Sequence, residues 1–181
     1  MLQSKYYTPD FLSAVEFKRI RKKIGMTQKE LAFFLHCGKA TVERWERKQE
    51  GVAGPVAILM HLLDEHPEIL DSYLLPEKKY PLRLLYMHGQ KLCTLIDVDD
   101  INQQVRIKNY TENLMFRAFG GEESPSYARY QEFLESRCFP RSRDKMKLVL
   151  KDLDLPFYDP FLIVTKTEGR MAEDDFWIKF I

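Results

Sequence analysis

The chain has few cysteines, no long apolar run and no marked excess of charge of either sign. Cys37, Cys93 and Cys138 are far apart and never form a C-x-x-C pair, which argues against a disulfide framework or a structural zinc site. No stretch approaches the roughly 18 apolar residues of a membrane span, and the first residues lack the pattern of a signal peptide. We therefore expect a cytoplasmic protein that does not associate with a membrane.

The overall charge points to no class of partner. The 181 residues include 28 Lys and Arg against 27 Asp and Glu, a formal net charge of +1. A hydrophobic content of 45% and a charged content of 30% are typical of globular proteins. Any electrostatic binding surface must therefore be local.

The hydrophobic pattern divides the chain into two domains, 1–75 and 76–181. Residues 10–75 have apolar positions at helical spacing, and a segment with two prolines, 76–81, follows as a plausible linker. The second domain begins with alternating segments that predict strands and continues, from about Ser126, with helical spacing. We expect an α+β protein, with an all-α N-terminal domain and a small antiparallel sheet with helices. The predicted strands are 82–86, 91–96 and 104–108, and the predicted helices include 146–153 and one capped by Asp159 and ended by Gly169.

The most informative segment lies between residues 17 and 48. One helix is predicted to end at Gly25, and Thr27 then caps a second helix, with Glu30 completing a capping box. A turn containing Gly38 follows, and a third helix opens at Lys39. Two short helices joined by a tight turn form the helix-turn-helix layout, whose second helix can enter a DNA major groove.

The local charge supports a nucleic-acid partner. Residues 15–50 contain ten basic and five acidic side chains, a net charge of +5, so the rest of the chain sums to −4. Such a concentration of positive charge attracts the phosphate backbone.

Two sequence runs, Arg21–Ala32 (RKKIGMTQKELA) and Thr41–Glu46 (TVERWE), resemble the Cro/repressor-like (XRE-type) helix-turn-helix domains. The resemblance covers about residues 14–70. The runs Gly54–Ala57 and Leu62–Glu68 look like the subgroup found in antitoxins and small autoregulators. The family implies a sequence-specific DNA-binding regulator.

The resemblance also implies roles for individual residues. Arg21 and Glu46 correspond to an internal ion pair, and Leu31, Ala32 and Val42 to the core. His36 stands where the family usually has glycine. At the start of the first helix of the pair, backbone N–H groups at Thr27 and Gln28 and the Gln28 side-chain amide would meet phosphate. In the second helix, Arg44 could contact guanine and Ala40 a thymine methyl. The implied DNA-binding residues are Thr27, Gln28, Gly38, Lys39, Ala40, Thr41, Glu43, Arg44 and Lys48.

The C-terminal half resembles a different module. The runs 133–143 and 174–178 look similar to the small module that accompanies HipA-type protein kinases, although the kinase motifs themselves are absent. This implies docking to a separately encoded kinase, through Arg137, Arg141, Phe176 and Trp177. The arginines could instead pair with nearby acids, and the aromatic residues could equally be core.

Other candidate sites have simpler interpretations. Asp97, Asp99 and Asp100 fit a turn at a strand end better than a metal site, and Glu173–Asp175 fit the acidic first turn of a short helix. Cys93 fits the core. No histidine pair has ligand spacing and no nucleophile–base pair is visible, so we expect no metal, no cofactor and no enzymatic activity.

Two functions follow. The first is a DNA-binding transcriptional regulator that reads double-stranded DNA as a homodimer, because one recognition helix covers only a short half-site. The alternative is an antitoxin-like interaction protein that binds a HipA-type kinase and uses DNA binding only for autoregulation.

Overall fold

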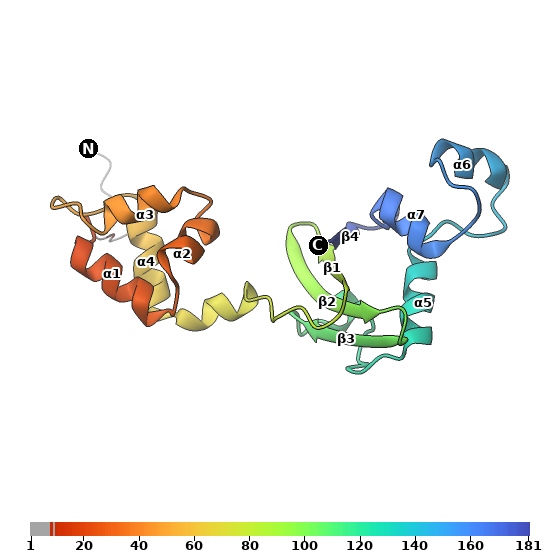
Figure 1. Cartoon of the computed structure of the whole chain (residues 1–181), viewed down its shortest axis with the longest axis horizontal. Helices are drawn as coiled ribbons and strands as arrows, with labels where there is room; N and C mark the ends of the chain where they lie inside the picture. Colours follow the sequence, from red (N-terminus) through yellow and green to blue (C-terminus); the bar gives the residue numbers. More distant parts are fainter. Residues whose placement is uncertain (1–7, 9) are drawn as a thin grey trace. The chain divides into compact units, whose positions relative to one another are not determined.

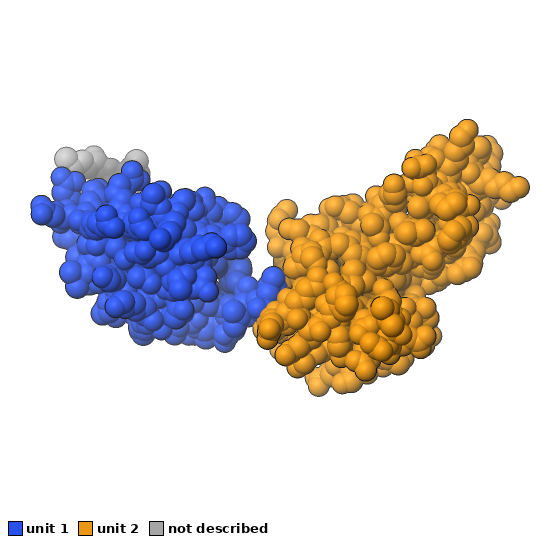
Figure 2. Space-filling view, in the orientation of Figure 1, with its two compact units in different colours: residues 1–75 blue, residues 76–181 orange. Residues whose placement is uncertain are grey.

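The computed structural model of the chain describes Thr8 and residues 10–181. It divides into two compact units, residues 1–75 and residues 76–181 (Figure 2). The first unit is helical, and the second combines helices with a four-stranded sheet, so the predicted α+β class is confirmed. Within the described part of the chain, no helix has the length and apolarity needed to cross a bilayer.

Four α-helices and a 3-10 helix make up the described part of unit 1 (Figure 1). Phe17, Ile20, Leu31, Val42 and Met60 are fully buried and meet in its core, as the helical spacing predicts. The elements are α1 (Ala14–Lys23), α2 (Gln28–Phe34), α3 (Lys39–Trp45), α4 (Pro55–Glu65) and η1 (Pro67–Ser72).

The helix starts are encoded locally. The Ser13 side chain accepts the backbone N–H of Glu16, and the Glu16 carboxylate accepts the backbone N–H of Ser13. Thr27 and Glu30 form the same reciprocal capping box at α2. The capping box predicted at Thr27 is therefore confirmed. The helices begin where side chains can satisfy the first free N–H groups.

Unit 2 is built on an antiparallel sheet with strand order β3-β2-β1-β4 (Figure 1). The three predicted strands are present, and the predicted helices that begin at Ser126, Met146 and Asp159 are confirmed. The elements are β1 (Leu82–His88), β2 (Lys91–Asp99), β3 (Gln104–Asn109), η2 (Leu114–Phe116), α5 (Tyr127–Ser136), α6 (Met146–Asp152), α7 (Pro160–Thr167) and β4 (Phe176–Phe180).

The fourth strand corrects one expectation. Residues 173–175 were predicted to open a short helix, but they lead into β4, which pairs with β1 so that Trp177 lies opposite Met87. The sequence after Asp175 alternates weakly, and its strand character depends on a free edge of β1 about 90 residues earlier in the chain.

One face of the sheet carries the core of unit 2. Leu84, Ile96 and Ile178 on the strands pack with Phe133 of α5 and Ile163 of α7, and all five are buried. Cys93 is fully buried in the same core, as predicted. The two helices therefore cover the apolar face that the alternating strand pattern creates.

The opposite face holds a buried ion pair. Arg83 Nε lies 2.5 Å from Asp97 Oδ1, and the same guanidinium donates to the carbonyls of Pro76 and Glu77. The Lys79 backbone N–H donates to Asp97 Oδ2. The start of the predicted linker is thus fastened to the sheet, and Asp97 belongs to a strand and an ion pair, not to the turn predicted for it.

Candidate nucleic-acid interface

Helix α3 has one buried and one exposed face. Val42 is fully buried, and the Trp45 ring packs against Phe17 with 5.6 Å between centroids. Lys39, Ala40 and Arg44 are exposed on the other side. The apolar residues fix the helix to the core and leave a mixed basic and small-residue surface accessible.

The turn between α2 and α3 is tight. The Cys37 N–H donates to the Ala32 carbonyl at 2.9 Å, and His36 adopts a left-handed conformation with φ of 50°. Glycine accepts this conformation without steric penalty, whereas a residue with a Cβ is strained in it. Gly38 then precedes α3 without a side-chain cap.

A buried network orients α3. Arg21 Nε of α1 lies 2.5 Å from Oε1 of Glu46, the residue that ends α3, so the predicted ion pair is confirmed. Gln28 Nε2 of α2 donates to Glu46 Oε2 at 2.7 Å. Burial opposes ionisation of Glu46, but the hydrogen bonds from Arg21 and Gln28 outweigh it and lower the pKa of this carboxyl group. One carboxylate therefore ties three helices together.

This network also engages Gln28. Its side-chain nitrogen donates to Glu46 inside the protein, and its contact with phosphate stays a prediction. Thr27 likewise uses its hydroxyl to cap α2.

Charges on the exposed face of α3 are only partly neutralised. Lys39 Nζ lies 3.0 Å from Glu43 Oε1, one turn along the helix, and Lys48 Nζ lies 3.8 Å from Glu50 Oε2. Arg44 and Arg47 form no ion pair with any residue that the structure describes. A hollow of about 650 Å³ borders this face and is lined by Ala40, Glu43, Arg44, Trp45, Arg47 and Lys48.

Residues 17–59 match the family model described as helix-turn-helix. This segment is a helix-turn-helix domain. No match was found among curated proteins or among solved structures. The matched residues run from α1 to the first half of α4, and thus include the whole of the α2–turn–α3 unit.

The predicted DNA-binding residues all lie on or next to the helix-turn-helix. Thr27, Gly38, Lys39, Ala40, Arg44 and Lys48 are exposed, and Gln28, Thr41 and Glu43 are half-buried. Arg47 was missing from the predicted set although it lies beside Arg44 in the lining of the hollow. Its position in the basic run after Trp45 was the signal that could have identified it.

The predicted docking residues of unit 2 are mostly used internally. Arg137 is buried; its Nη1 lies 2.7 Å from Asp174 Oδ2 and its Nε donates to the Gly169 carbonyl. Phe176 stacks on Tyr86 with 5.0 Å between centroids. Pairing with a nearby acid accounts for Arg137, and packing against the core accounts for Phe176, which are the alternatives that the sequence left open. Docking through these two residues stays a prediction.

Of the two remaining docking candidates, Trp177 is half-buried and Arg141 is exposed. The Trp177 indole N–H donates to the Gly89 carbonyl at 2.7 Å, and Arg170 lies over its ring. Arg141 is exposed and pairs with Glu135, with Nε 2.9 Å from Oε1. Both side chains thus have partners of their own.

The two buried thiols of unit 2 offer little reactivity. Burial raises the pKa of the Cys138 thiol to about 12, and it also raises the pKa of Cys93. Both thiols are therefore protonated at neutral pH and are poor nucleophiles. Asp99 accepts the backbone N–H groups of Ile101 and Asn102, as the strand-end turn predicts. In the described part of the chain, no group of three or more His, Cys, Asp or Glu side chains could hold a metal ion.

Proposed function

We propose that this protein is a sequence-specific DNA-binding transcriptional regulator that inserts α3 into the major groove. The observation that carries the proposal is the division of α3 into a buried face and an exposed one with Lys39, Ala40 and Arg44. A helix of this kind, held at a fixed angle by the Arg21–Glu46 pair, is the element that reads base edges in helix-turn-helix proteins.

The exposed residues have complementary tasks. Arg44 can donate two parallel hydrogen bonds to guanine O6 and N7, and the Ala40 methyl fits beside a thymine methyl. Lys39, Arg47 and Lys48 supply charge for flanking phosphates, which position the helix but carry no sequence information. The hollow beside α3 leaves space for the sugar–phosphate backbone.

Selection of bound sites from random duplexes at physiological salt tests this proposal. We expect one enriched motif composed of two inverted half-sites, about 10 base pairs between centres. If Arg44→Ala binds the enriched sequence with the same affinity as wild type, the placement of α3 is contradicted. Recovery of no motif above background would contradict sequence-specific binding altogether.

We also propose that the protein acts as a homodimer, because inverted half-sites require two copies of the reading helix. Exposed apolar side chains in unit 1 support this: Ile58 and Leu62 lie one turn apart on α4, and Ile69 follows on η1. Their exposed fractions are 36%, 46% and 43%. Burial of such residues between two copies would remove apolar surface from water.

Sedimentation of Leu62→Glu compared with Val15→Glu tests the dimer. Both substitutions place a carboxylate on an exposed apolar position of unit 1, but Val15 lies on α1. We expect Leu62→Glu to sediment as a monomer and Val15→Glu to behave as wild type. Equal sedimentation of the two variants would contradict a dimer formed through α4.

We propose that the chain works by binding and not by catalysis. The antitoxin-like alternative, with docking to a HipA-type kinase, is the weaker proposal. Two of the four residues implied in docking, Arg137 and Phe176, are committed to internal contacts. Co-purification of a kinase that depends on Trp177 and Arg141 would favour it.

A further inference from the structure

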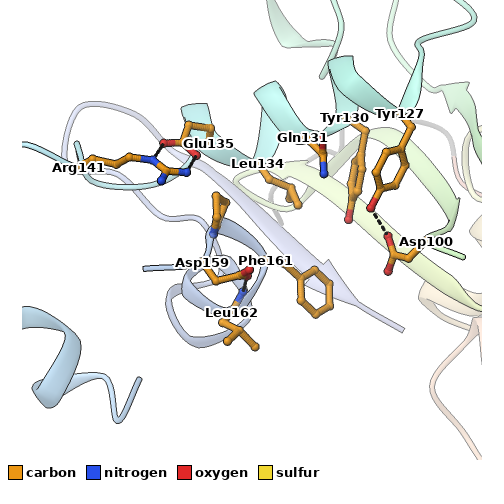
Figure 3. Close-up of a pocket in the computed structure, with 11 residues that line it drawn as sticks. Asp100, Tyr127, Tyr130, Gln131, Leu134, Glu135, Arg141, Asp159, Phe161 and Leu162 are labelled. Atoms are coloured by element: carbon orange, nitrogen blue, oxygen red, sulfur yellow. Dashed lines mark hydrogen bonds and ion pairs between the residues drawn. The ribbon is translucent and has the colours of Figure 1, made fainter. Parts of the chain in front are cut away.

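A cleft in unit 2 lies between α5 and the start of α7 (Figure 3). Its volume of about 550 Å³ is in the range of small-molecule sites. Tyr127, Tyr130 and Leu134 line it from α5, and Phe161 and Leu162 from α7. Asp100, from the turn after β2, closes one end, as Figure 3 shows.

The cleft contains an unpartnered buried hydroxyl. Tyr130 is 1% exposed, and its hydroxyl is the one buried side-chain polar atom without a hydrogen bond in the part of the chain that the structure describes. In Figure 3 the rings of Tyr127 and Tyr130 descend from α5, and both hydroxyls point to the side of the cleft where Asp100 and Phe161 lie. A buried hydroxyl without a partner is unfavourable, so a polar group supplied by a ligand would satisfy it.

The charges of the cleft select the sign of that ligand. Asp100 accepts the Tyr127 hydroxyl at 3.1 Å, and Asp159 accepts the Leu162 N–H at 2.9 Å. Neither carboxylate has an ion pair with a described residue. Arg141 is the only base in the lining, and it is paired with Glu135. The cleft therefore carries an uncompensated negative charge, which attracts a cation.

The start of α7 does not reverse this selection. Pro160 has no N–H group, and Asp159 occupies the N–H of Leu162, so this helix end is not open to an anion. Its partial positive charge, ~0.5 of an elementary charge, offsets only part of the two carboxylates.

We propose that this cleft binds a small organic amine in its protonated form. Its ammonium group would donate to Asp100 and to the Tyr130 hydroxyl, while its apolar body packs against Leu134, Phe161 and Leu162. Every residue of the site belongs to unit 2, so the proposal does not depend on DNA binding.

Calorimetric titration of the full chain with 2-phenylethylamine tests the proposal, with 2-phenylethanol as a neutral probe of the same shape. We expect the amine to bind with a Kd below about 10 mM and the alcohol to have a Kd about tenfold higher. Equal affinities, or no binding of the amine, would overturn the assignment. Tighter binding of a lysine-containing peptide than of the free amine would also overturn it, in favour of a protein partner.

Variants locate the site. Asp100→Asn keeps an acceptor for Tyr127 and removes the charge, so Kd should rise about tenfold, whereas Glu123→Gln removes an exposed carboxylate outside the cleft and should leave Kd unchanged. Tyr130→Phe should raise Kd about threefold while the melting temperature stays level or rises, because it deletes an unsatisfied buried group. Unchanged affinity in Asp100→Asn, or in Tyr130→Phe, would overturn the proposed contacts.

Discussion

Arg21 Nε of α1 lies 2.5 Å from Glu46 Oε1 at the end of α3, and both side chains are almost completely buried. The pair joins the first and third helices of the helix-turn-helix, and Gln28 adds the second. Its contribution is geometric as well as energetic, because it sets the direction in which α3 presents Lys39 and Arg44. Removing one partner of such a buried ion pair is strongly destabilising, because the other charge stays buried without its counter-charge.

We predict that Glu46→Ala destabilises unit 1 by about 3 kcal/mol, because the Arg21 charge remains buried without an acidic partner. Glu43→Ala also replaces a glutamate by alanine, but its pair with Lys39 is much more accessible to water, so the loss should be less than about 0.5 kcal/mol. Urea unfolding followed by Trp45 fluorescence in a Trp177→Phe background measures both values. Similar losses in the two variants would show that the buried pair has no special role.

The turn before α3 leads to a second prediction. His36 has a φ of 50°, which is strained for a residue with a Cβ. His36→Gly should raise the free energy of unfolding by about 0.5–1 kcal/mol, since relief of strain exceeds the entropy that glycine adds to the unfolded chain. Gly25→Ala, at a φ of 74°, is the matched reverse change and should destabilise. A lower stability of His36→Gly in the same unfolding experiment would contradict this.

The features that could be predicted from the sequence are those encoded within a few residues. Thr27 and Glu30 are three positions apart, so their capping box is visible before any fold is known. The Arg83–Asp97 pair depends on the register of β1 against β2, and β4 depends on an edge strand about 90 residues away. The cleft around Tyr130 is formed by three segments of unit 2 that are distant in sequence, and no local sequence pattern predicts that they lie together.

In the candidate interface, too, local features could be predicted from the sequence and long-range contacts could not. The resemblance to a helix-turn-helix family placed Lys39, Ala40 and Arg44 on the exposed face of α3, where the structure has them. The same reasoning did not predict the hydrogen bond from the Gln28 amide to Glu46, 18 residues later in the chain. Predicting which polar side chains are free requires knowing which long-range partners the fold brings to them.

For DNA recognition, we predict that Arg44→Ala weakens binding to the selected site by about 1–3 kcal/mol and relaxes the preference at one base pair. Arg47→Ala removes one exposed charge beside α3 and should weaken binding to all sequences alike. Affinity measured at several salt concentrations against matched and mismatched duplexes separates the two effects. A uniform loss in Arg44→Ala would reassign this side chain to a phosphate.

The final prediction concerns acid stability. Asp64 of α4 pairs with Arg19 and Lys23 of α1, at 2.6 and 2.7 Å, and these hydrogen bonds lower the pKa of Asp64 well below its ordinary value of 3.8. Because the folded state holds this carboxyl group ionised, the stabilisation is complete above the unfolded pKa and is lost as the pH falls through that value towards the folded one.

Wild-type unit 1 should therefore lose stability between pH 5 and about pH 3 more steeply than Asp64→Asn, which has no carboxyl group to protonate at that position. Glu65→Gln removes the adjacent exposed carboxylate and should keep the wild-type slope. Urea midpoints measured across this pH range by Trp45 fluorescence, again in the Trp177→Phe background, give the three slopes. Parallel curves for wild type and Asp64→Asn would mean that the bridge between α1 and α4 does not contribute to the acid response.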